Sequence, residues 1–164
     1  MIQVKSLRNN RSQILKVSGV YKWYADRDLA NEIGIPDTIW NMLTKVKFEN
    51  KIYGYVYVGM SGNLYKRIGS HLNSKITKST LRKSIAGLLN TTSKEKISDC
   101  IDKFIIEYTH INLDKKEREQ IEDVEMAKSV LPLNIDRNKN IYVQEFIQFL
   151  REKRRKEITL GDID

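Results

Sequence analysis

The sequence predicts a small α+β domain, in which a three-stranded mixed or antiparallel sheet is flanked by helices and carries a helical insert and a C-terminal helix. Three short segments are rich in β-branched and aromatic residues, which favour strands. The segments between them have apolar residues at intervals of three and four, which favour helices. The chain has 164 residues, enough for one domain with its own hydrophobic core.

The first two predicted strands are joined by a long connection. Residues 14–24 and 53–59 have the strand composition, whereas residues 25–51 between them are polar and interrupted by a glycine and a proline. We expect an antiparallel pair of strands with a partly helical insert at 25–51. Tyr53, Tyr55 and Tyr57 share the alternation of the second strand and are expected to point in the same direction.

The other predicted elements follow in order along the chain. They are a helix at 61–72, a helix at 80–89, a strand at 102–108, a helix from a capping box at Asp114 to Pro132, and a helix at 140–157. The expected buried side of the Asp114 helix consists of Ile121, Val124, Ala127 and Val130. We therefore divide the chain into a main domain at 1–138 and a C-terminal helix with a basic tail at 139–164.

The composition excludes several classes of protein. A single cysteine, Cys100, can form neither a disulfide framework nor a four-cysteine zinc site, so we expect a reducing compartment. No apolar run approaches the roughly 20 residues that span a bilayer, and the N-terminal residues contain no apolar signal region. We therefore expect a cytoplasmic protein that has no membrane partner.

The positive charge is concentrated in one stretch of the chain. Lys and Arg number 29 against 21 Asp and Glu, which gives a net charge of +8. Residues 50–94 contain 8 basic residues and no carboxylate, whereas residues 95–138 have a net charge of −4. A surface built from the first stretch would attract a polyanion such as nucleic acid, although a solvated basic face has the same composition. The expected DNA-backbone contacts are Lys66, Lys75, Lys78, Arg82 and Lys83.

Six residues in a fixed order give the strongest functional signal. They are Tyr21 in a Gly-Val-Tyr motif, Tyr57 in a Tyr-Val-Gly motif, Arg67, His71, Glu122, and Asn134 at the end of Leu-Pro-Leu-Asn. Arg67 and His71 are four residues apart and share one face of a predicted helix. Glu122 and Asn134 are twelve residues apart. This ordered set resembles the GIY-YIG nuclease family, and the resemblance extends over about residues 17–138.

The resemblance implies a metal-dependent endonuclease that hydrolyses phosphodiester bonds in duplex or branched DNA. Arg67 would stabilise the charge at phosphorus, because its planar guanidinium matches phosphate oxygens. Glu122 would hold Mg²⁺ or Mn²⁺, ions that take one or two protein oxygens and keep several waters. Tyr21 would accept the proton of the attacking water, with His71 and Tyr57 orienting it.

The residues leave several alternatives open. Glu125 lies one turn after Glu122 on nearly the same helix face and is the alternative metal ligand. Neutral His71 is the alternative to Tyr21 as the general base. Asn134 is expected to brace the backbone near the site rather than act chemically. A non-catalytic nucleic-acid-binding module on the same fold is the alternative function, and a protein-interaction scaffold would leave the carboxylate-free stretch unexplained.

The chain departs from the family pattern in three respects. Tyr21 and Tyr57 are 36 residues apart, and this long insert resembles the arrangement in some restriction-enzyme members. Met60 follows the second motif, where repair-type members have a lysine. There is no recognisable separate DNA-binding module, so target specificity is expected from the insert, the basic helices or a partner, which includes a second copy of the chain.

Overall fold

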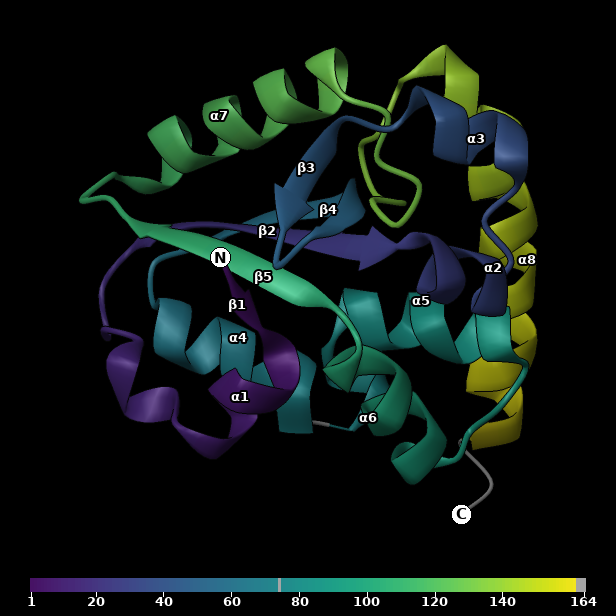
Figure 1. The fold of residues 1–164 in the computed structure, drawn as a ribbon, viewed down its shortest axis with the longest axis horizontal. Helices are drawn as coiled ribbons and strands as arrows, with labels where there is room; N and C mark the ends of the chain where they lie inside the picture. The colour runs from purple at the N-terminus through teal and green to yellow at the C-terminus, as the bar shows by residue number, and fades with distance from the viewer. Residues whose placement is uncertain (74, 162–164) are drawn as a thin grey trace.

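A five-stranded antiparallel sheet forms the centre of the protein (Figure 1). In the computed structural model, which describes residues 1–73 and 75–161, the strand order is β1-β5-β2-β4-β3 and every neighbouring pair is antiparallel. The strands are β1 (Ile2–Gln3), β2 (Gly19–Asp26), β3 (Lys45–Phe48), β4 (Lys51–Ser61) and β5 (Ile105–His110). The predicted α+β class is confirmed.

The prediction of three strands is wrong, because two further strands form the edges of the sheet. The central strands β2, β4 and β5 overlap the three predicted segments, but the predicted bounds are wrong at two ends, since residues 14–18 precede β2 and Asp102 is the last residue of α6. The edge strands are too short to show a periodic pattern, since β1 has 2 residues and β3 has 4. β3 also lies within the insert, so part of the insert extends the sheet by pairing with β4.

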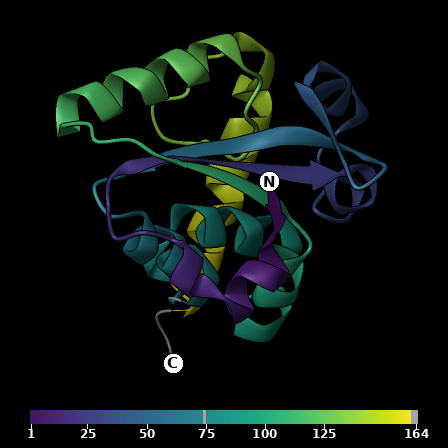
Figure 2. The same cartoon turned by 60° about the vertical axis from the view of Figure 1, so that its left-hand side comes forward.

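Helices cover both faces of this sheet. They are α1 (Val4–Asn9), α2 (Arg27–Glu32), α3 (Asp37–Met42), α4 (Leu64–Asn73), α5 (Thr80–Leu89), α6 (Lys94–Asp102), α7 (Lys115–Lys128) and α8 (Gln144–Gly161), with the 3-10 turns η1 (Arg11–Gln13), η2 (Ile76–Lys78) and η3 (Ile141–Val143). α7 lies over one face, and α1, α4, α5 and α6 lie over the other (Figure 1, Figure 2). α8 packs along α5, and the last three residues of the predicted basic tail lie outside the described residues.

α6 is a helix that the sequence pattern does not predict. Its buried side consists of only Ile97, Cys100 and Ile101, in a stretch that is otherwise polar and charged. Ser93 caps the helix by accepting a hydrogen bond from the backbone N–H of Lys96. Such a short apolar side gives a weak periodic signal, so the helix depends on its cap and on packing against α5 and α1.

α7 begins as predicted but buries a different side. Asp114 and Glu117 form the expected capping box, in which each side chain accepts the other residue's backbone N–H. Met126 is the buried residue of the helix, whereas Val124 is 47% exposed. The predicted buried side is therefore wrong at Val124 and at Ala127, which are both exposed. Glu125 contacts polar groups on the sheet, and this contact turns the face with Met126 toward the strands.

A β-bulge in β4 reverses the direction of its side chains. Trp23 lies opposite Tyr57 and Tyr24 lies opposite Tyr55, so Val56 is an extra residue between the two pairs. Tyr57 consequently belongs to the core on the α4 side of the sheet, whereas Tyr55 belongs to the cluster on the α7 side. The expectation that the tyrosines of this strand point in one direction is therefore wrong, because regular alternation holds only in the absence of a bulge.

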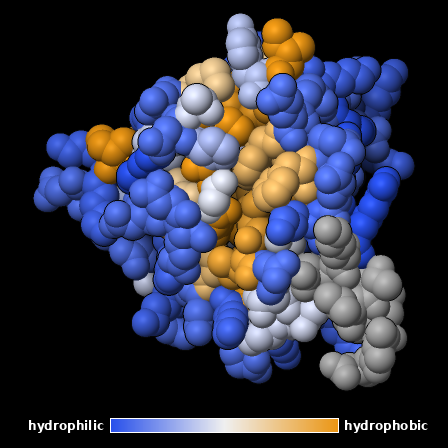
Figure 3. All heavy atoms as spheres, turned by 90° about the vertical axis from the view of Figure 1, so that its right-hand side faces the viewer, coloured by the Kyte–Doolittle hydropathy of each residue, from blue (hydrophilic) through white to orange (hydrophobic). Residues whose placement is uncertain are grey.

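One side of the protein keeps an apolar strip on its surface. Figure 3 shows this strip between hydrophilic side chains, on the side where α3 and α8 lie in Figure 1. Met42 at the end of α3, Ile141 in η3 and Phe149 in α8 are exposed apolar residues of these elements, and they belong to neither core cluster. Within the described residues, the helices lack the combination of length and apolar composition that a membrane span requires.

Candidate active site

Two buried tyrosines from neighbouring strands meet on the α4 side of the sheet. Tyr21 of β2 and Tyr57 of β4 are 0% and 4% exposed, and their ring centroids are 6.3 Å apart. The Tyr21 ring extends across Gly59, its pairing partner on β4, and a side chain at Gly59 would collide with the Tyr21 hydroxyl. The glycine of the second motif therefore gives the Tyr21 hydroxyl room to cross its neighbouring strand.

α4 brings a cation and an imidazole against the Tyr21 hydroxyl. The Arg67 Nε–H donates a hydrogen bond to the Tyr21 hydroxyl oxygen at 3.1 Å, and His71 Nε2 lies 2.9 Å from the same oxygen. Arg67 and His71 are one helical turn apart, so they face the same side, as the spacing predicts. Leu64, Ile68 and Leu72 beside them are fully buried, which fixes the rotation of the helix.

Ser79 holds His71 from its other side. His71 Nδ1 lies 2.7 Å from Ser79 Oγ, and this oxygen also accepts the backbone N–H of Arg82 at the start of α5. Burial, together with the charges of Arg67 and Arg82, holds the pKa of His71 well below its usual range. His71 is therefore a neutral imidazole between two hydroxyls. A serine before a helix signals an N-cap, but no sequence signal reveals its contact with His71.

Burial raises the pKa of both tyrosines. For Tyr21, desolvation outweighs the opposing effect of the Arg67 charge, so its pKa lies above the ordinary value of 10. The pKa of Tyr57 is raised further above that value, because its ring is buried and adjoins Tyr21. Both groups are neutral hydroxyls at neutral pH, and the neighbouring tyrosines raise the pKa of Arg67, which keeps its charge.

Glu122 of α7 lines a hollow together with Arg67 and Tyr57. The hollow has a volume of about 180 Å³. The rest of its wall consists of Thr80, Asn134, Ile135, Asp136 and Arg137. Burial raises the pKa of Glu122, and the charge of Arg137 opposes this shift. The carboxylate and the phosphate-binding candidate Arg67 thus face one space, as the resemblance implies.

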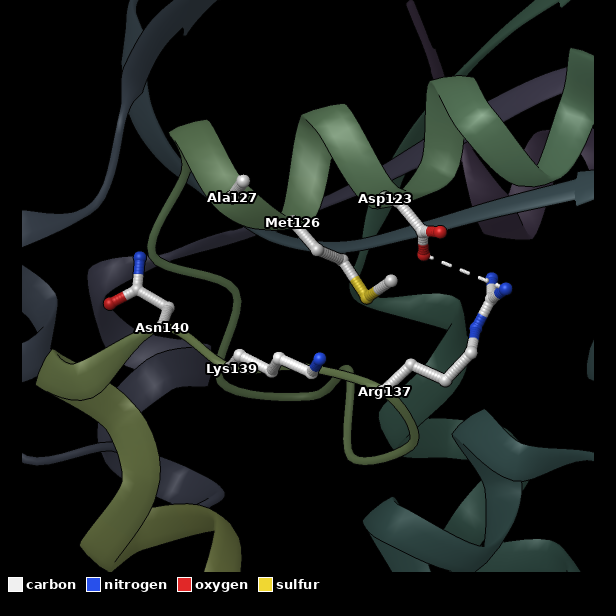
Figure 4. Close-up of a pocket in the computed structure, with 6 residues that line it drawn as sticks. All are labelled: Asp123, Met126, Ala127, Arg137, Lys139 and Asn140. Atoms are coloured by element: carbon white, nitrogen blue, oxygen red, sulfur yellow. Dashed lines mark ion pairs between the residues drawn. The ribbon is translucent and has the colours of Figure 1, made fainter.

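Arg137 is the ion-pair partner of Glu122, a contact that the sequence did not predict. Its guanidinium pairs with Glu122 and also lies 3.5 Å from Asp123. Figure 4 shows the pair with Asp123 beneath α7. Arg137 has a positive φ of 61°, and the buried side chain of Asn138 holds the turn by donating to the carbonyl of Leu131 at 3.0 Å. The sequence signal for Arg137 is its position three residues after Asn134, since that spacing places both residues in one loop.

Glu125, the alternative metal ligand, is bound to side chains of the sheet. Its Oε2 atom accepts a hydrogen bond from Lys22 Nζ at 3.0 Å and from the Tyr55 hydroxyl at 3.1 Å. It does not line the hollow that Glu122 and Arg67 share. These contacts favour Glu122 over Glu125 as the carboxylate of the site.

Asn134 braces the edge of β4. Its side-chain oxygen accepts the backbone N–H of Val58, and its side-chain nitrogen donates to the carbonyl of Val58, both at 2.8 Å. The backbone N–H of Leu133 donates to the carbonyl of Val56 at 3.1 Å, beside these two bonds. The side-chain amide of Asn134 therefore bonds to β4 as the backbone of a neighbouring strand would, one residue after Tyr57. This contact agrees with the bracing role expected from the sequence.

The prediction that Arg82 contacts DNA is wrong. Its side chain is fully buried, and its guanidinium donates to the backbone carbonyls of His71 and Leu72 and to Ser98 Oγ. Arg82 therefore ties the end of α4 to α5 and α6, and it is unavailable to a phosphate. The other expected contacts lie at the surface. Lys66, Lys75 and Lys78 are exposed, and Lys83 is partly exposed.

The described residues contain no group of three or more His, Cys, Asp or Glu side chains that could hold a metal ion between them. A fully protein-made cage is therefore absent from the part of the chain that the structure describes. Glu122 and Asp136 are the carboxylates that line the central hollow. A sparse oxygen set of this kind fits Mg²⁺ or Mn²⁺, which complete their coordination with water and phosphate oxygens.

Comparisons with known proteins agree with this arrangement. The family model of the GIY-YIG catalytic domain matches residues 19–157, which include both tyrosine strands, α4, α7 and most of α8. Neither a search of curated proteins nor a search of solved structures gave a match. The family match covers most of the chain and both tyrosine motifs, so the chain belongs to the GIY-YIG catalytic domain family.

Proposed function

We propose that this protein is a metal-dependent endonuclease that hydrolyses phosphodiester bonds in DNA. Membership of the GIY-YIG family supports a nuclease. The observation that carries the proposal is the shared hollow of Arg67 and Glu122, because Arg67 at the same time contacts the Tyr21 hydroxyl. A phosphate bound there would meet the Arg67 cation and the Glu122 carboxylate, with Tyr57 in the wall and the buried Tyr21 hydroxyl directly behind Arg67.

Arg67 is assigned to the phosphate. Its guanidinium is charged at all relevant pH values and presents a planar set of donors that matches two phosphate oxygens. The bond from its Nε–H to Tyr21 fixes its orientation before substrate arrives. Such pre-positioned charge stabilises the pentavalent transition state more than the ground state.

Tyr21 is assigned as the proton acceptor, with His71 behind it. In the tautomer that donates His71 Nδ1–H to Ser79 Oγ, the Nε2 atom is free to accept the Tyr21 hydroxyl proton. Tyr21 then takes a proton from the attacking water as it passes its own proton to His71. This relay needs a neutral tyrosine and a neutral imidazole, which are the forms that the pKa shifts favour.

Glu122 is assigned to the metal. A bound Mg²⁺ or Mn²⁺ would neutralise the charge that develops on the leaving oxygen. Arg137 forms an ion pair with Glu122 in the free protein, so this pair must break when Glu122 binds the metal. The pair is partly exposed, so breaking it costs little.

A second candidate function is a non-catalytic nucleic-acid-binding module on the same fold. The observation that favours it is the ion pair of Glu122 with Arg137, since a carboxylate that stays paired would hold no metal. The two candidates differ in a single respect, which is whether a divalent ion enables cleavage.

The experiment incubates the purified protein with supercoiled plasmid, branched oligonucleotides and single-stranded oligonucleotides, each with Mg²⁺, Mn²⁺ or EDTA. The proposal predicts nicked or linear plasmid, or cut oligonucleotides, with a divalent ion and intact substrates in EDTA. Equal cleavage in EDTA would contradict the assigned metal. Tight DNA binding with no cleavage under any of these conditions would favour the non-catalytic module.

A further inference from the structure

Three hollows adjoin one another and share their walls. The central one contains Arg67 and Glu122. A hollow of about 290 Å³, between the β4–α4 turn and the start of α7, shares Glu122 and Arg137 with it. A hollow of about 180 Å³ beside α8 shares Ile135 and Asp136 with it. The three hollows therefore form one trench, with the candidate active site in its middle.

This trench is basic, and its cations lie mainly at the two ends. Seven cationic side chains line it against three carboxylates. The cations are Lys115, Arg118, Arg137, Arg67, Arg151, Arg154 and Arg155, and the carboxylates are Glu119, Glu122 and Asp136. A line of positive charge that passes through the site matches a chain of phosphates better than a single anion.

At the α7 end, Lys115 lies 3.7 Å from Glu119, and Arg118 is positioned by the backbone around it. Arg118 donates to the carbonyl of Leu113, one residue before the cap of α7. The guanidinium of Arg118 also packs over Gly62 in the β4–α4 turn, where a Cβ would lie 3.4 Å from its NH2 atom. The positive charge therefore sits between two segments that are distant in sequence, directly beside the hollow that Glu122 lines.

The cations at the other end belong to α8. Arg151 donates to the carbonyl of Ile135 at 3.0 Å, which ties α8 to the loop that carries Asn134 and Arg137. Gly87 of α5 lets the backbone of α8 approach closely at Arg154, where a Cβ would lie 3.1 Å from the backbone nitrogen. The close packing of α8 on α5 thus places two arginines at the edge of the site.

Few of the charged residues that line the trench come from the carboxylate-free stretch at 50–94. That stretch contributes Tyr57, Arg67, Thr80 and the turn at 60–62, and the other cations come from α7, α8 and the loop between them. Lys75 and Lys78 are exposed but line none of these three hollows. Two separate basic surfaces therefore compete as the path of a polyanion, and they are distinguishable by substitution.

We propose that the trench binds the phosphodiester backbone of one nucleic-acid strand, which runs between Lys115 and Arg118 at one end and Arg154 at the other. The strand can belong to a duplex or be single. One of its phosphates lies beside Arg67 and Glu122 in the central hollow. That the polymer is nucleic acid rests on the proposed function, but the assigned contacts differ from those expected from the sequence, which are Lys75, Lys78 and their neighbours.

The test measures binding against salt concentration with EDTA present, by fluorescence anisotropy of labelled duplex and single-stranded oligonucleotides. Each lost phosphate contact flattens the slope of log K against log[salt] by about 0.9 on duplex DNA and about 0.7 on single strands. The double variant Lys115→Gln/Arg118→Gln is expected to flatten it by about 1.8 or 1.4 respectively. The matched control Lys75→Gln/Lys78→Gln removes the same charge and is expected to leave the slope unchanged.

The α8 end is tested in the same assay. Arg154→Gln is expected to flatten the slope by about one contact, and Arg154→Lys, which keeps the charge, is expected to restore most of it. Thermal unfolding of both variants checks that the packing of α8 is retained. If Arg154→Gln unfolds early, Lys115→Gln/Arg118→Gln alone decides the outcome.

Two results would overturn the trench. The first is a flattened slope for Lys75→Gln/Lys78→Gln with a normal slope for Lys115→Gln/Arg118→Gln, and the second is a wild-type slope for both. Either result together with Mg²⁺-dependent cleavage leaves the proposed function intact. Failure of the wild type to bind any oligonucleotide at low salt would overturn both.

Discussion

The two faces of the central strand pair use the same residue type in opposite ways. On the α7 face, the Tyr24 hydroxyl donates to Glu107 at 2.9 Å and the Tyr55 hydroxyl donates to Glu125 at 3.1 Å. On the α4 face, the Tyr21 hydroxyl accepts a hydrogen bond from Arg67. Burial raises the pKa of all three tyrosines; the carboxylates raise it further at Tyr24 and Tyr55, whereas the Arg67 charge opposes the rise at Tyr21.

This difference separates structural tyrosines from a candidate catalytic one. A tyrosine beside a carboxylate is a poor base, because losing its own proton would break their hydrogen bond and place two negative charges side by side. A tyrosine that faces a cation and a neutral imidazole has both an electrostatic aid and a place to send its proton. We therefore assign chemistry to the α4 face and packing to the α7 face.

The largest expected effect comes from removing one hydroxyl on each face. Tyr21→Phe is expected to lower the cleavage rate by roughly 10²–10⁴, the scale of losing a general acid or base. The matched control Tyr55→Phe removes a hydroxyl of the same strand pair and is expected to keep the rate within a few-fold of wild type. Single-turnover cleavage of a plasmid or oligonucleotide measures both. Equal losses in the two variants would remove the distinction between the faces.

The next effect concerns the cation on the α4 face. Arg67→Ala is expected to lower the rate by about 10²–10³, the loss caused by deleting one pre-positioned charge stabiliser. Arg67→Lys is expected to recover only part of it, since a point charge cannot reproduce the planar guanidinium. DNA affinity should change far less, because the other cations carry it. Near wild-type cleavage by Arg67→Ala would exclude its assignment to the phosphate.

The pH dependence sharpens the same comparison. The pKa of His71 is lowered, so its inactive protonated form appears only well below pH 6.5, and Tyr21 stays protonated past pH 10. The rate is therefore expected to fall by up to tenfold per pH unit only on the acid side of this window, with no bend near 6.5. A bend at 6.5 would indicate an exposed histidine, and a rise that continues above pH 10 would indicate a tyrosinate base. A pH series of single-turnover rates measures this.

The smallest effect concerns Arg137. Arg137→Ala is expected to raise the affinity of the free protein for Mn²⁺ by roughly 1.5- to 5-fold, because a partly exposed ion pair is worth about 0.2–1 kcal/mol. Titration followed by electron paramagnetic resonance at pH 8 measures free Mn²⁺ directly. Lys139→Ala, a neighbouring cation of the same loop, is the control and is expected to change nothing. An unchanged affinity in Arg137→Ala would show that the pair with Glu122 does not compete with the metal.

The sequence predicted what depends on local spacing. The four-residue interval of Arg67 and His71 placed both on one face of α4, and the capping box at Asp114 marked the start of α7. The interval from Glu122 to Asn134 selected the glutamate that lines the hollow over its neighbour Glu125. Each of these relations follows from helix geometry or from a motif read along the chain.

What the sequence could not predict depends on contacts between distant segments. The bulge at Val56 turns Tyr57 toward Tyr21, and nothing in the alternation of β4 reveals it. The sequence predicts Arg82 as a surface cation, but its side chain is enclosed by α4, α5 and α6. Arg137 reaches Glu122 from a separate loop. Charge counted along the chain likewise differs from charge gathered on a surface, since most trench cations lie outside the carboxylate-free stretch.

Glu122, and not Glu125, is assigned to the chemistry of the hollow that Arg67 and Tyr57 line. The most direct measurement compares Mg²⁺-dependent plasmid cleavage and DNA binding of Glu122→Gln and Glu125→Gln, two variants that remove one charge each from adjacent turns of α7. Glu122→Gln is expected to abolish cleavage and to keep or tighten DNA binding, because a negative charge beside phosphate is lost. Glu125→Gln is expected to keep most activity. The reverse pattern, with Glu125→Gln inactive and Glu122→Gln active, would contradict the assignment of Glu122 as the metal ligand.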